Sequence, residues 1–357
     1  MPTITRDDVE AKLKQVMDPH TGVDLVSGGN VDDISIDGNT LNVQIVLGYP
    51  AKSFEPRLEE LVQEALPGAR VGVKSNMVAH EVQEGVKPLK GVKNIIAVAS
   101  GKGGVGKSTL SVNLALALSA EGARVGILDA DIYGPSQPRM LGITGKPQSK
   151  DGKTLEPMSS YDIQAMSIGF LVDEESPMIW RGPMVTQALE QLLKDTQWDD
   201  LDYLVVDMPP GTGDTPLPLA QKVPVSGSVI VTTPQDIALL DARKAYKMFD
   251  KVEIPVLGVV ENMSTHICSN CGHEEHIFGS GGGATMAQDY GTVLLGDVPL
   301  DVSIREGADG GRPTVVSDPD GAIAEKYRAI ARMATARLAQ RKKDYSAKFP
   351  NIVIQQN

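Results

Sequence analysis

Aromatic side chains, cysteines and positive charge are all in short supply in this sequence of 357 residues. Phe, Trp and Tyr make up 4% of the chain, and its two cysteines are Cys268 and Cys271. Lysine and arginine number 34 against 46 aspartates and glutamates, so the formal net charge is −12. General nucleic-acid binding depends on cationic side chains that displace phosphate counterions. The charge balance therefore argues against a nucleic-acid partner.

Long apolar runs are missing as well. No stretch approaches the ~18 residues expected of a membrane span, and the opening residues, MPTITRDDVEAKLKQV, have no apolar centre like that of a signal peptide. Two closely spaced cysteines in a long chain favour metal or redox chemistry in a reducing compartment over a disulfide framework. These features predict a cytoplasmic protein with no stable membrane association.

The hydrophobic pattern divides the chain into four segments. Residues 1–77 mix helical and strand-like runs and predict a small α+β domain. Residues 78–93 are polar with no clear period and predict a linker, residues 94–345 predict a large α/β domain, and residues 346–357 a C-terminal tail.

Local signals fill in the first segment. Thr5 followed by Asp8 resembles a capping box that opens a helix. Two alternating runs around the turn at 37–39 predict a β-hairpin. Residues 53–66 suit a helix and residues 69–74 a short strand.

From Asn94 onward, short apolar runs alternate with helical stretches. Near-continuous apolar strands of this kind are typical of a parallel sheet that is covered on both faces. The pattern thus predicts a doubly wound, mostly parallel α/β fold, in which ligands bind beyond the carboxyl ends of the strands. Strands are expected at 94–99, 124–128, 203–206, 228–232, 256–260 and 293–295, and helices at 108–120, 183–194 and 236–250.

A phosphate-binding loop follows the first of these strands. Residues 101–109, GKGGVGKST, fit the pattern G-x-x-x-x-G-K-[ST] between an expected strand and an expected helix. The amides of such a loop and the helix N-terminus bind phosphate oxygens. Lys107 would neutralise the β- and γ-phosphates, and the Ser108 hydroxyl would ligate Mg²⁺. The predicted nucleotide-binding residues of the loop are Gly101, Lys102, Gly103, Gly104, Val105, Gly106, Lys107, Ser108 and Thr109.

Acidic residues end two neighbouring apolar runs. Asp207 closes the run Leu204–Asp207, where a carboxylate can hold Mg²⁺ through water in P-loop enzymes. Asp129 and Asp131 end another run, and alternate residues share one side of a strand. We therefore expect Ser108 and Asp207 at a magnesium site, with the second acidic pair nearby.

The extra Lys102 makes GKGGVGKST similar to the deviant Walker A motif of the MinD/ParA/nitrogenase-iron-protein group of dimeric ATPases. The resemblance implies catalytic roles for three residues. Lys102 would reach the partner subunit's nucleotide, Lys107 would bind phosphate, and Asp131 would position the attacking water. It also implies that Asn262, after a late strand, reads the adenine of ATP, the alternative being a polar turn residue.

The two cysteines lie in the segment His266–His276, HICSNCGHEEH. Two thiolates cannot complete a tetrahedral or four-iron site by themselves. The missing ligands would come either from His273 and His276, giving a zinc knuckle within one subunit, or from a second copy of the chain, giving a four-cysteine site on a two-fold axis. The residues alone leave both arrangements open.

Further motifs resemble the Mrp/ApbC family of iron–sulfur cluster carrier ATPases over about residues 94–340. They are DADIYGPSQP (129–138), PMIWRGPM (177–184), DMPPGTGD (207–214), ENMS (261–264) and the C-x-x-C followed by FGSGGG (278–283). The segments DPHTGVDLV (18–26) and LGYPAKS (47–53) resemble the small N-terminal domain of many bacterial members. Stand-alone relatives of that domain often carry a cysteine near this second segment. This chain has none there, which favours docking or recognition over a second cluster site.

The resemblance implies a homodimer that holds a labile [4Fe–4S] cluster on Cys268 and Cys271 of each subunit. ATP binding and hydrolysis would govern exchange of the cluster with scaffold proteins and apo iron–sulfur proteins. The implied cofactors are ATP, Mg²⁺ and the [4Fe–4S] cluster, with zinc as the alternative at the cysteines. Two other functions stay open: a ParA- or MinD-like positioning ATPase on DNA or membrane, and a P-loop ATPase with a structural zinc knuckle.

Three further basic side chains have structural interpretations. Residues 320–343 predict a helix that packs on the core and leaves a solvated cationic face, which includes Arg332. His20 and His80 are isolated in the sequence and are expected to be surface or structural residues.

Overall fold

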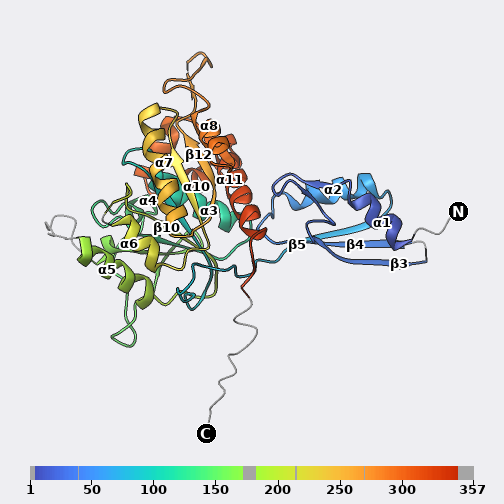
Figure 1. Ribbon diagram of the computed structural model, residues 1–357, viewed down its shortest axis with the longest axis horizontal. Coiled ribbons are helices and arrows are strands. Elements are labelled where there is room, and N and C mark those ends of the chain that lie inside the picture. The colour runs from blue at the N-terminus through green and yellow to red at the C-terminus, as the bar shows by residue number, and fades with distance from the viewer. Residues whose placement is uncertain (1–4, 39, 172–181, 214, 269, 345–357) are drawn as a thin grey trace, which may run out of the picture.

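The chain folds into a small N-terminal domain beside a larger α/β domain (Figure 1). The computed structural model describes residues 5–38, 40–171, 182–213, 215–268 and 270–344. The predicted tail at 346–357 and residues 177–181 of the PMIWRGPM motif lie outside these ranges.

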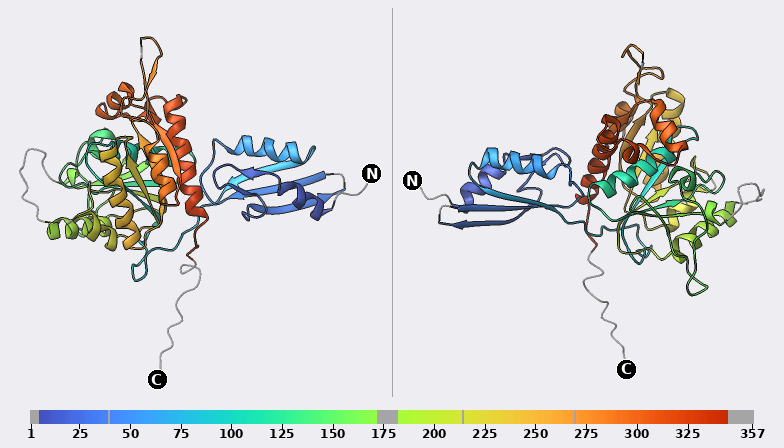
Figure 2. Two further views of the ribbon diagram at one scale, coloured as in Figure 1. Left: turned by 45° about the horizontal axis from the view of Figure 1, so that its top comes forward. Right: turned by 180° about the vertical axis from the view of Figure 1, so that it is seen from behind.

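The N-terminal domain packs two helices on one face of a three-stranded sheet (Figure 2). Strand β4 pairs antiparallel with β3 and parallel with β5. The elements are α1 (Arg6–Leu13), β1 (Met17–Asp18), β2 (Val23–Asp24), β3 (Val31–Asp37), β4 (Thr40–Leu47), α2 (Glu55–Ala65) and β5 (Arg70–Ser75).

Local sequence signals explain this domain well. The Thr5 hydroxyl accepts from the Asp8 amide at 3.2 Å and the Asp8 carboxylate accepts from the Thr5 amide at 3.0 Å, so the predicted capping box is confirmed. Alternation along β4 buries Val43, Ile45 and Leu47 in the domain core, as expected for a strand with one covered face.

The large domain is built on an eight-stranded sheet in the order β15-β12-β11-β6-β10-β7-β9-β8. All neighbours pair in parallel except β8, which runs antiparallel to β9 at the edge. The strands are β6 (Val92–Ser100), β7 (Val125–Asp129), β8 (Met158–Ser160), β9 (Ile163–Ser167), β10 (Leu201–Asp207), β11 (Gly227–Thr232), β12 (Val256–Asn262) and β15 (Leu294–Val298). The doubly wound, mostly parallel fold is confirmed.

Helices cover both faces of this sheet. Helices α3 and α11 pack together on one face, and α7 and α8 pack on the other, next to α5 and α6. The helices are α3 (Lys107–Ala120), α4 (Gln137–Met140), α5 (Gly182–Asp195), α6 (Pro216–Lys222), α7 (Asp236–Lys251), α8 (Gly282–Asp289), α9 (Val302–Asp309), α10 (Thr314–Ser317) and α11 (Ala322–Ala339), with a 3₁₀ turn at Ile168–Phe170.

The sheet departs from expectation at its edge and at its start. Strands β8 and β9 were not predicted, because β9 is short, carries Gln164 and follows a turn in which Tyr161 and Asp162 have positive φ. Strand β6 begins at Val92, inside the segment expected to be a linker. His80, also in that segment, is buried, and its Nδ1 lies 2.9 Å from Asn94 Oδ1.

The expected cationic face of the last helix needs one correction. Arg332 in α11 is 6% exposed and forms ion pairs with Glu121 and Glu325, so it belongs to the packed side of the helix. His20 takes part in a polar network with Arg332, which agrees with the structural role expected for it. Among the described residues, no helix has both the length and the apolar character needed to cross a bilayer.

Burial in the N-terminal domain predicts a stability difference between two neighbours on β4. Ile45→Ala should lower the free energy of unfolding by about 2–5 kcal/mol, because a fully buried side chain leaves a cavity. Gln44→Ala, on the exposed side of the same strand, should stay within about 0.5 kcal/mol of the unchanged protein. Urea unfolding of the full chain measures both, and equal effects would contradict the assigned core.

Candidate functional site

The predicted site residues gather where β6, β7 and β10 end. In the sheet register, Asp207 at the end of β10 pairs with Asp129 at the end of β7. On the other side of β10, strand β6 leads into the phosphate-binding loop, which opens α3. The parallel register therefore brings the loop and both carboxylates to one edge of the sheet.

Close approach explains two of the glycines in the loop. Gly106 caps α3 with a left-handed φ of 83°, and a Cβ there would lie 2.1 Å from Asn262 Nδ2. A Cβ on Gly101 would lie 2.0 Å from the backbone of Asp241 in α7. Both positions thus require glycine, because α7 and the end of β12 press against the loop.

Lys107 is the centre of the polar cluster. Its ammonium group is 2.5 Å from Asp207 Oδ1, 3.2 Å from Ser108 Oγ and 4.0 Å from Asp131 Oδ2. The lysine is 6% exposed and Asp207 is fully buried. Four of the residues predicted from sequence are therefore brought together in one polar group, of which Lys107 and Asp207 are buried.

Two residues that the sequence interpretation missed hold Asp207 in place. Ser111 Oγ donates to Asp207 Oδ1 at 2.8 Å, and Gln137 Nε2 donates to Asp207 Oδ2 at 3.0 Å. Gln137 lies in the DADIYGPSQP motif, so the motif itself was the available signal. Both donors fix the carboxylate toward Lys107.

Asp129 organises the loop that follows β7. Its carboxylate accepts from the Gln137 amide at 3.0 Å and from Ser167 Oγ at 3.1 Å. Complete burial, reinforced by the nearby Asp207 charge, raises its pKa. Burial also raises the pKa of the Asp131 carboxyl, although Lys107 opposes that shift.

Lys102 stands apart from this cluster. It is half-buried in the loop, and its carbonyl accepts from Ser100 Oγ at 2.8 Å. Among the described residues, its ammonium group forms no ion pair with Asp131 or Asp207.

Asn262 lies against the loop and lines a cavity beside it. Its Nδ2 donates to the Val105 carbonyl at 2.8 Å, which ties the end of β12 to the loop. The adjoining cavity of about 190 Å³ reaches Gly106 and Thr109, and its apolar wall includes Met140, Met263, Leu300 and Ile304. An apolar cavity with a few polar groups is the usual form of a small-molecule site.

The cysteines lie on an arm that projects from the domain beyond β12 (Figures 1 and 2). The arm is a hairpin of β13 (His266–Ile267) and β14 (Glu274–Glu275). Cys271 is exposed and Cys268 half-buried. Amides of Asn270 and Cys271 that donate to the Cys268 sulfur lower its pKa, which favours the thiolate, the form that binds metal.

Two histidines of the arm contact groups other than the cysteines. His276 Nδ1 lies 3.1 Å from the Ser264 carbonyl, and His273 Nε2 lies 3.8 Å from a Glu275 carboxylate oxygen. In the part of the chain that the structure describes, no group of three or more His, Cys, Asp or Glu side chains could hold a metal ion. The intrachain Cys₂His₂ arrangement is therefore not assembled among these residues.

Comparison with known proteins agrees with this architecture. The family described as NUBPL iron-transfer P-loop NTPase matches residues 91–335, and the family described as iron–sulfur cluster assembly protein matches residues 6–75. The chain is 54% identical over 307 residues to an iron–sulfur cluster carrier protein of Escherichia coli K12, covering 84% of this chain and 83% of that one. It is 48% identical over 340 residues to one of Haemophilus influenzae, covering 93% and 92%.

A solved structure is also similar. It is a nucleotide-binding protein of Archaeoglobus fulgidus in complex with ADP, which is 37% identical with a TM-score of 0.56 and covers 65% of this chain and 90% of that one. The resemblance to iron–sulfur cluster carrier ATPases, predicted from motifs, is thereby confirmed. The chain belongs to the NUBPL iron-transfer family of P-loop NTPases and carries an N-terminal domain of the iron–sulfur cluster assembly family.

Proposed function

We propose that this protein binds and hydrolyses ATP and, as a homodimer, carries a [4Fe–4S] cluster on Cys268 and Cys271 of both subunits. The cluster is cargo, received from scaffold proteins and passed to apo iron–sulfur proteins. One observation carries the proposal: a buried lysine–carboxylate cluster at a phosphate-binding loop and a thiol pair on a projecting arm occur in one domain.

The cluster around Lys107 suits Mg·ATP. Ser108 Oγ and an Asp207 oxygen both lie within 3.2 Å of the Lys107 ammonium group. These two oxygen atoms therefore already face a positive charge, that of the lysine. Oxygen ligands of this kind are those that Mg²⁺ prefers. When bound, the metal would neutralise charge on the phosphates. Lys107 would then leave Asp207 and contact phosphate oxygens instead. Ser108 and Asp207 would be left to ligate Mg²⁺.

Asp131 is proposed to position the water that attacks the terminal phosphate. It lies 4.0 Å from Lys107 at the phosphate end of the site, and burial raises its pKa. A carboxylate with a raised pKa accepts a proton from water more readily. We assign Asp131 to orient the attacking water and Lys102, outside the buried cluster, to reach the partner subunit's nucleotide.

The cavity beside Asn262 is the proposed site of the adenine ring. Its apolar wall would pack against the ring. Asn262 would hold the phosphate-binding loop in place through its hydrogen bond to the Val105 carbonyl. The amide nitrogen of Asn262 donates one hydrogen to that carbonyl, and we assign its second hydrogen and its Oδ1 to contact with the adenine.

The thiol pair supports a cluster shared by two subunits. Two cysteines supply two thiolates, and a four-iron cluster held by cysteine needs four. Among the described residues, the cysteines and histidines of the arm do not come together as a group of three or more potential ligands, so a second copy of the arm is the better source of the other two. The exposure of Cys271 would also let the cluster leave.

Lys107→Ala should weaken binding of Mg·ATP by about 10- to 100-fold, because a charge-assisted contact to phosphate is worth ~1.5–3 kcal/mol. Lys87→Ala, at an exposed lysine in the segment before β6 and outside the phosphate-binding loop, is the control. Titration with a fluorescent ATP analogue measures both. Equal affinity in the two variants would remove Lys107 from the site.

Asp131→Asn should keep nucleotide affinity and lower kcat by at least about 100-fold, the usual scale for a lost general base. In the unchanged protein, the ionised form of Asp131 is the one expected to be active. Because its pKa is raised, kcat should fall on acidification at a higher pH than an ordinary aspartate would give. Phosphate release measured against pH tests both points; a wild-type rate in the variant would exclude the role.

Cys268→Ser and Cys271→Ser should each abolish cluster loading but leave nucleotide affinity unchanged, because the arm lies outside the phosphate loop. Anaerobic reconstitution followed by iron, sulfide and zinc analysis, with the mass of the oligomer, measures the effect. His273→Ala, on the same arm, should keep its iron. Loss of bound zinc in that variant would instead favour the knuckle.

A further inference from the structure

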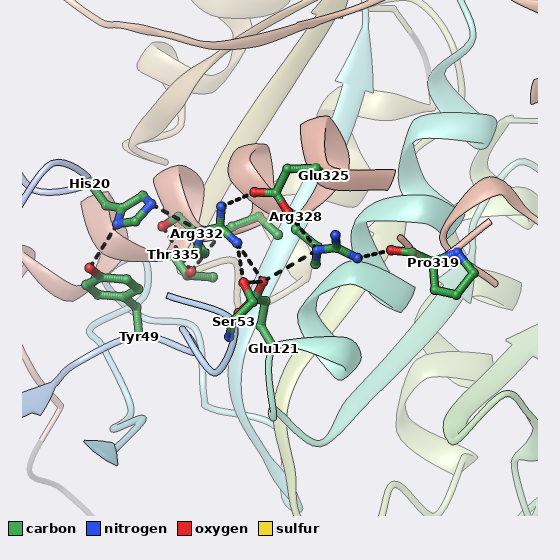
Figure 3. A network of polar contacts seen from close by, with 10 residues as sticks. His20, Tyr49, Ser53, Glu121, Pro319, Glu325, Arg328, Arg332 and Thr335 are labelled. Carbon is green, nitrogen blue, oxygen red and sulfur yellow. Dashed lines mark hydrogen bonds and ion pairs between the residues drawn. The ribbon is translucent and has the colours of Figure 1, made fainter. Parts of the chain in front are cut away.

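The N-terminal domain meets the large domain at the C-terminal ends of α3 and α11 (Figure 3). Loop 48–54 of the small domain, which contains most of the LGYPAKS motif, forms its side of the contact. A Cβ on Gly48 would lie 3.1 Å from the Ala339 side chain, and Ala336 of α11 belongs to the core of the small domain. The two domains therefore share packed surface in addition to polar contacts.

Glu121, which caps the C-terminus of α3, is the polar centre of this junction. Its carboxylate accepts from the Ser53 amide at 2.9 Å and from Ser53 Oγ at 2.5 Å. Arg332 of α11 donates to the same carboxylate at 2.6 Å. Glu121 is 1% exposed and Arg332 6%, so water does little to screen this pair.

The network continues into the small domain. Arg332 Nε donates to His20 Nε2 at 3.1 Å, so that nitrogen is an acceptor and the ring proton sits on Nδ1. His20 Nδ1 lies 3.2 Å from the Tyr49 hydroxyl, which donates to Asp18 at 2.9 Å. The DPHTG and LGYPAKS motifs, which cluster binding does not use, therefore converge on the end of α3.

Helix α3 connects this junction directly to the phosphate loop. Its 14 residues rise about 21 Å, with Lys107 at the first turn and Glu121 at the C-cap. The helix packs on β7, β10 and α11, and small shifts of packed helices are a recurrent way of coupling distant sites. A shift of the C-terminal end of α3 would therefore also move its N-terminal end, at the phosphate-binding loop.

We propose that docking of the N-terminal domain, through Ser53 on Glu121, fixes the position of α3 and so strengthens nucleotide binding at the loop. By linkage, bound nucleotide strengthens docking by the same factor. Ser53 and Glu121 act as positioning residues. This inference rests on the proposed binding of ATP at the loop, and it gives the N-terminal domain a regulatory role.

Two variants of the full chain break the junction. Ser53→Asp places a like charge against Glu121, and Glu121→Gln removes the charge while keeping the shape. Ser53→Thr keeps the hydroxyl and serves as the conservative rescue. Ser35→Asp, on exposed β3 with its side-chain contact to Asn42 inside the small domain, is the matched control.

The readouts are the Kd for a fluorescent ATP analogue with Mg²⁺ and the hydrogen exchange of amides 48–54 with and without that nucleotide. Ser53→Asp and Glu121→Gln should each raise Kd about fivefold, at the lower end of typical coupling, whereas Ser53→Thr and Ser35→Asp should match the unchanged protein. Nucleotide should slow exchange at 48–54 in the unchanged protein and not in Ser53→Asp.

The coupling would be overturned if both junction variants kept the Kd of the unchanged protein. It would also be overturned if nucleotide did not alter hydrogen exchange at 48–54 in the unchanged protein. Neither result would contradict ATP binding. Failure of the unchanged protein to bind nucleotide would overturn the proposed function, and the coupling with it.

Discussion

The buried contact between Lys107 and Asp207 is the constraint on which the nucleotide site depends. A charge taken out of water must be paired and hydrogen-bonded, and removing one partner of such a pair costs about 3–5 kcal/mol. The pair sits where the loop, α3 and β10 meet, and Ser111 and Gln137 complete the hydrogen bonding of the carboxylate. The fold thereby maintains a cation beside two oxygen donors at the carboxyl edge of the sheet.

The two chemistries of the protein occupy different kinds of structure. Hard oxygen donors and the lysine lie on rigid strand ends and a helix N-terminus, where geometry is tightly held. The soft thiols lie on a short hairpin outside the sheet, with Cys271 open to solvent. That separation suits the proposed function, in which the nucleotide site stays intact while a metal cluster is passed on.

Sequence reasoning succeeded where the signal is local. The run from β6 through the loop into α3 is contiguous, and its residues suffice to predict it. It failed where a role depends on a distant partner: Arg332 looked solvated until Glu121, 211 positions away, was placed beside it. Gln137 escaped notice because its partner Asp207 lies 70 positions further along. Strand β9, which lies between β7 and the edge strand β8, was missed because it is only five residues long and carries the polar Gln164.

The location of Ala336 has a consequence for biosynthesis. This residue, on helix α11, is fully buried in the core of the N-terminal domain, whose own strands and helices are all synthesised before it. Domains generally begin to fold as they leave the ribosome, N-terminal first. Here the N-terminal domain keeps an apolar gap until helix α11 has been synthesised, so a product truncated before that helix would expose the gap and be a substrate for chaperones and proteases.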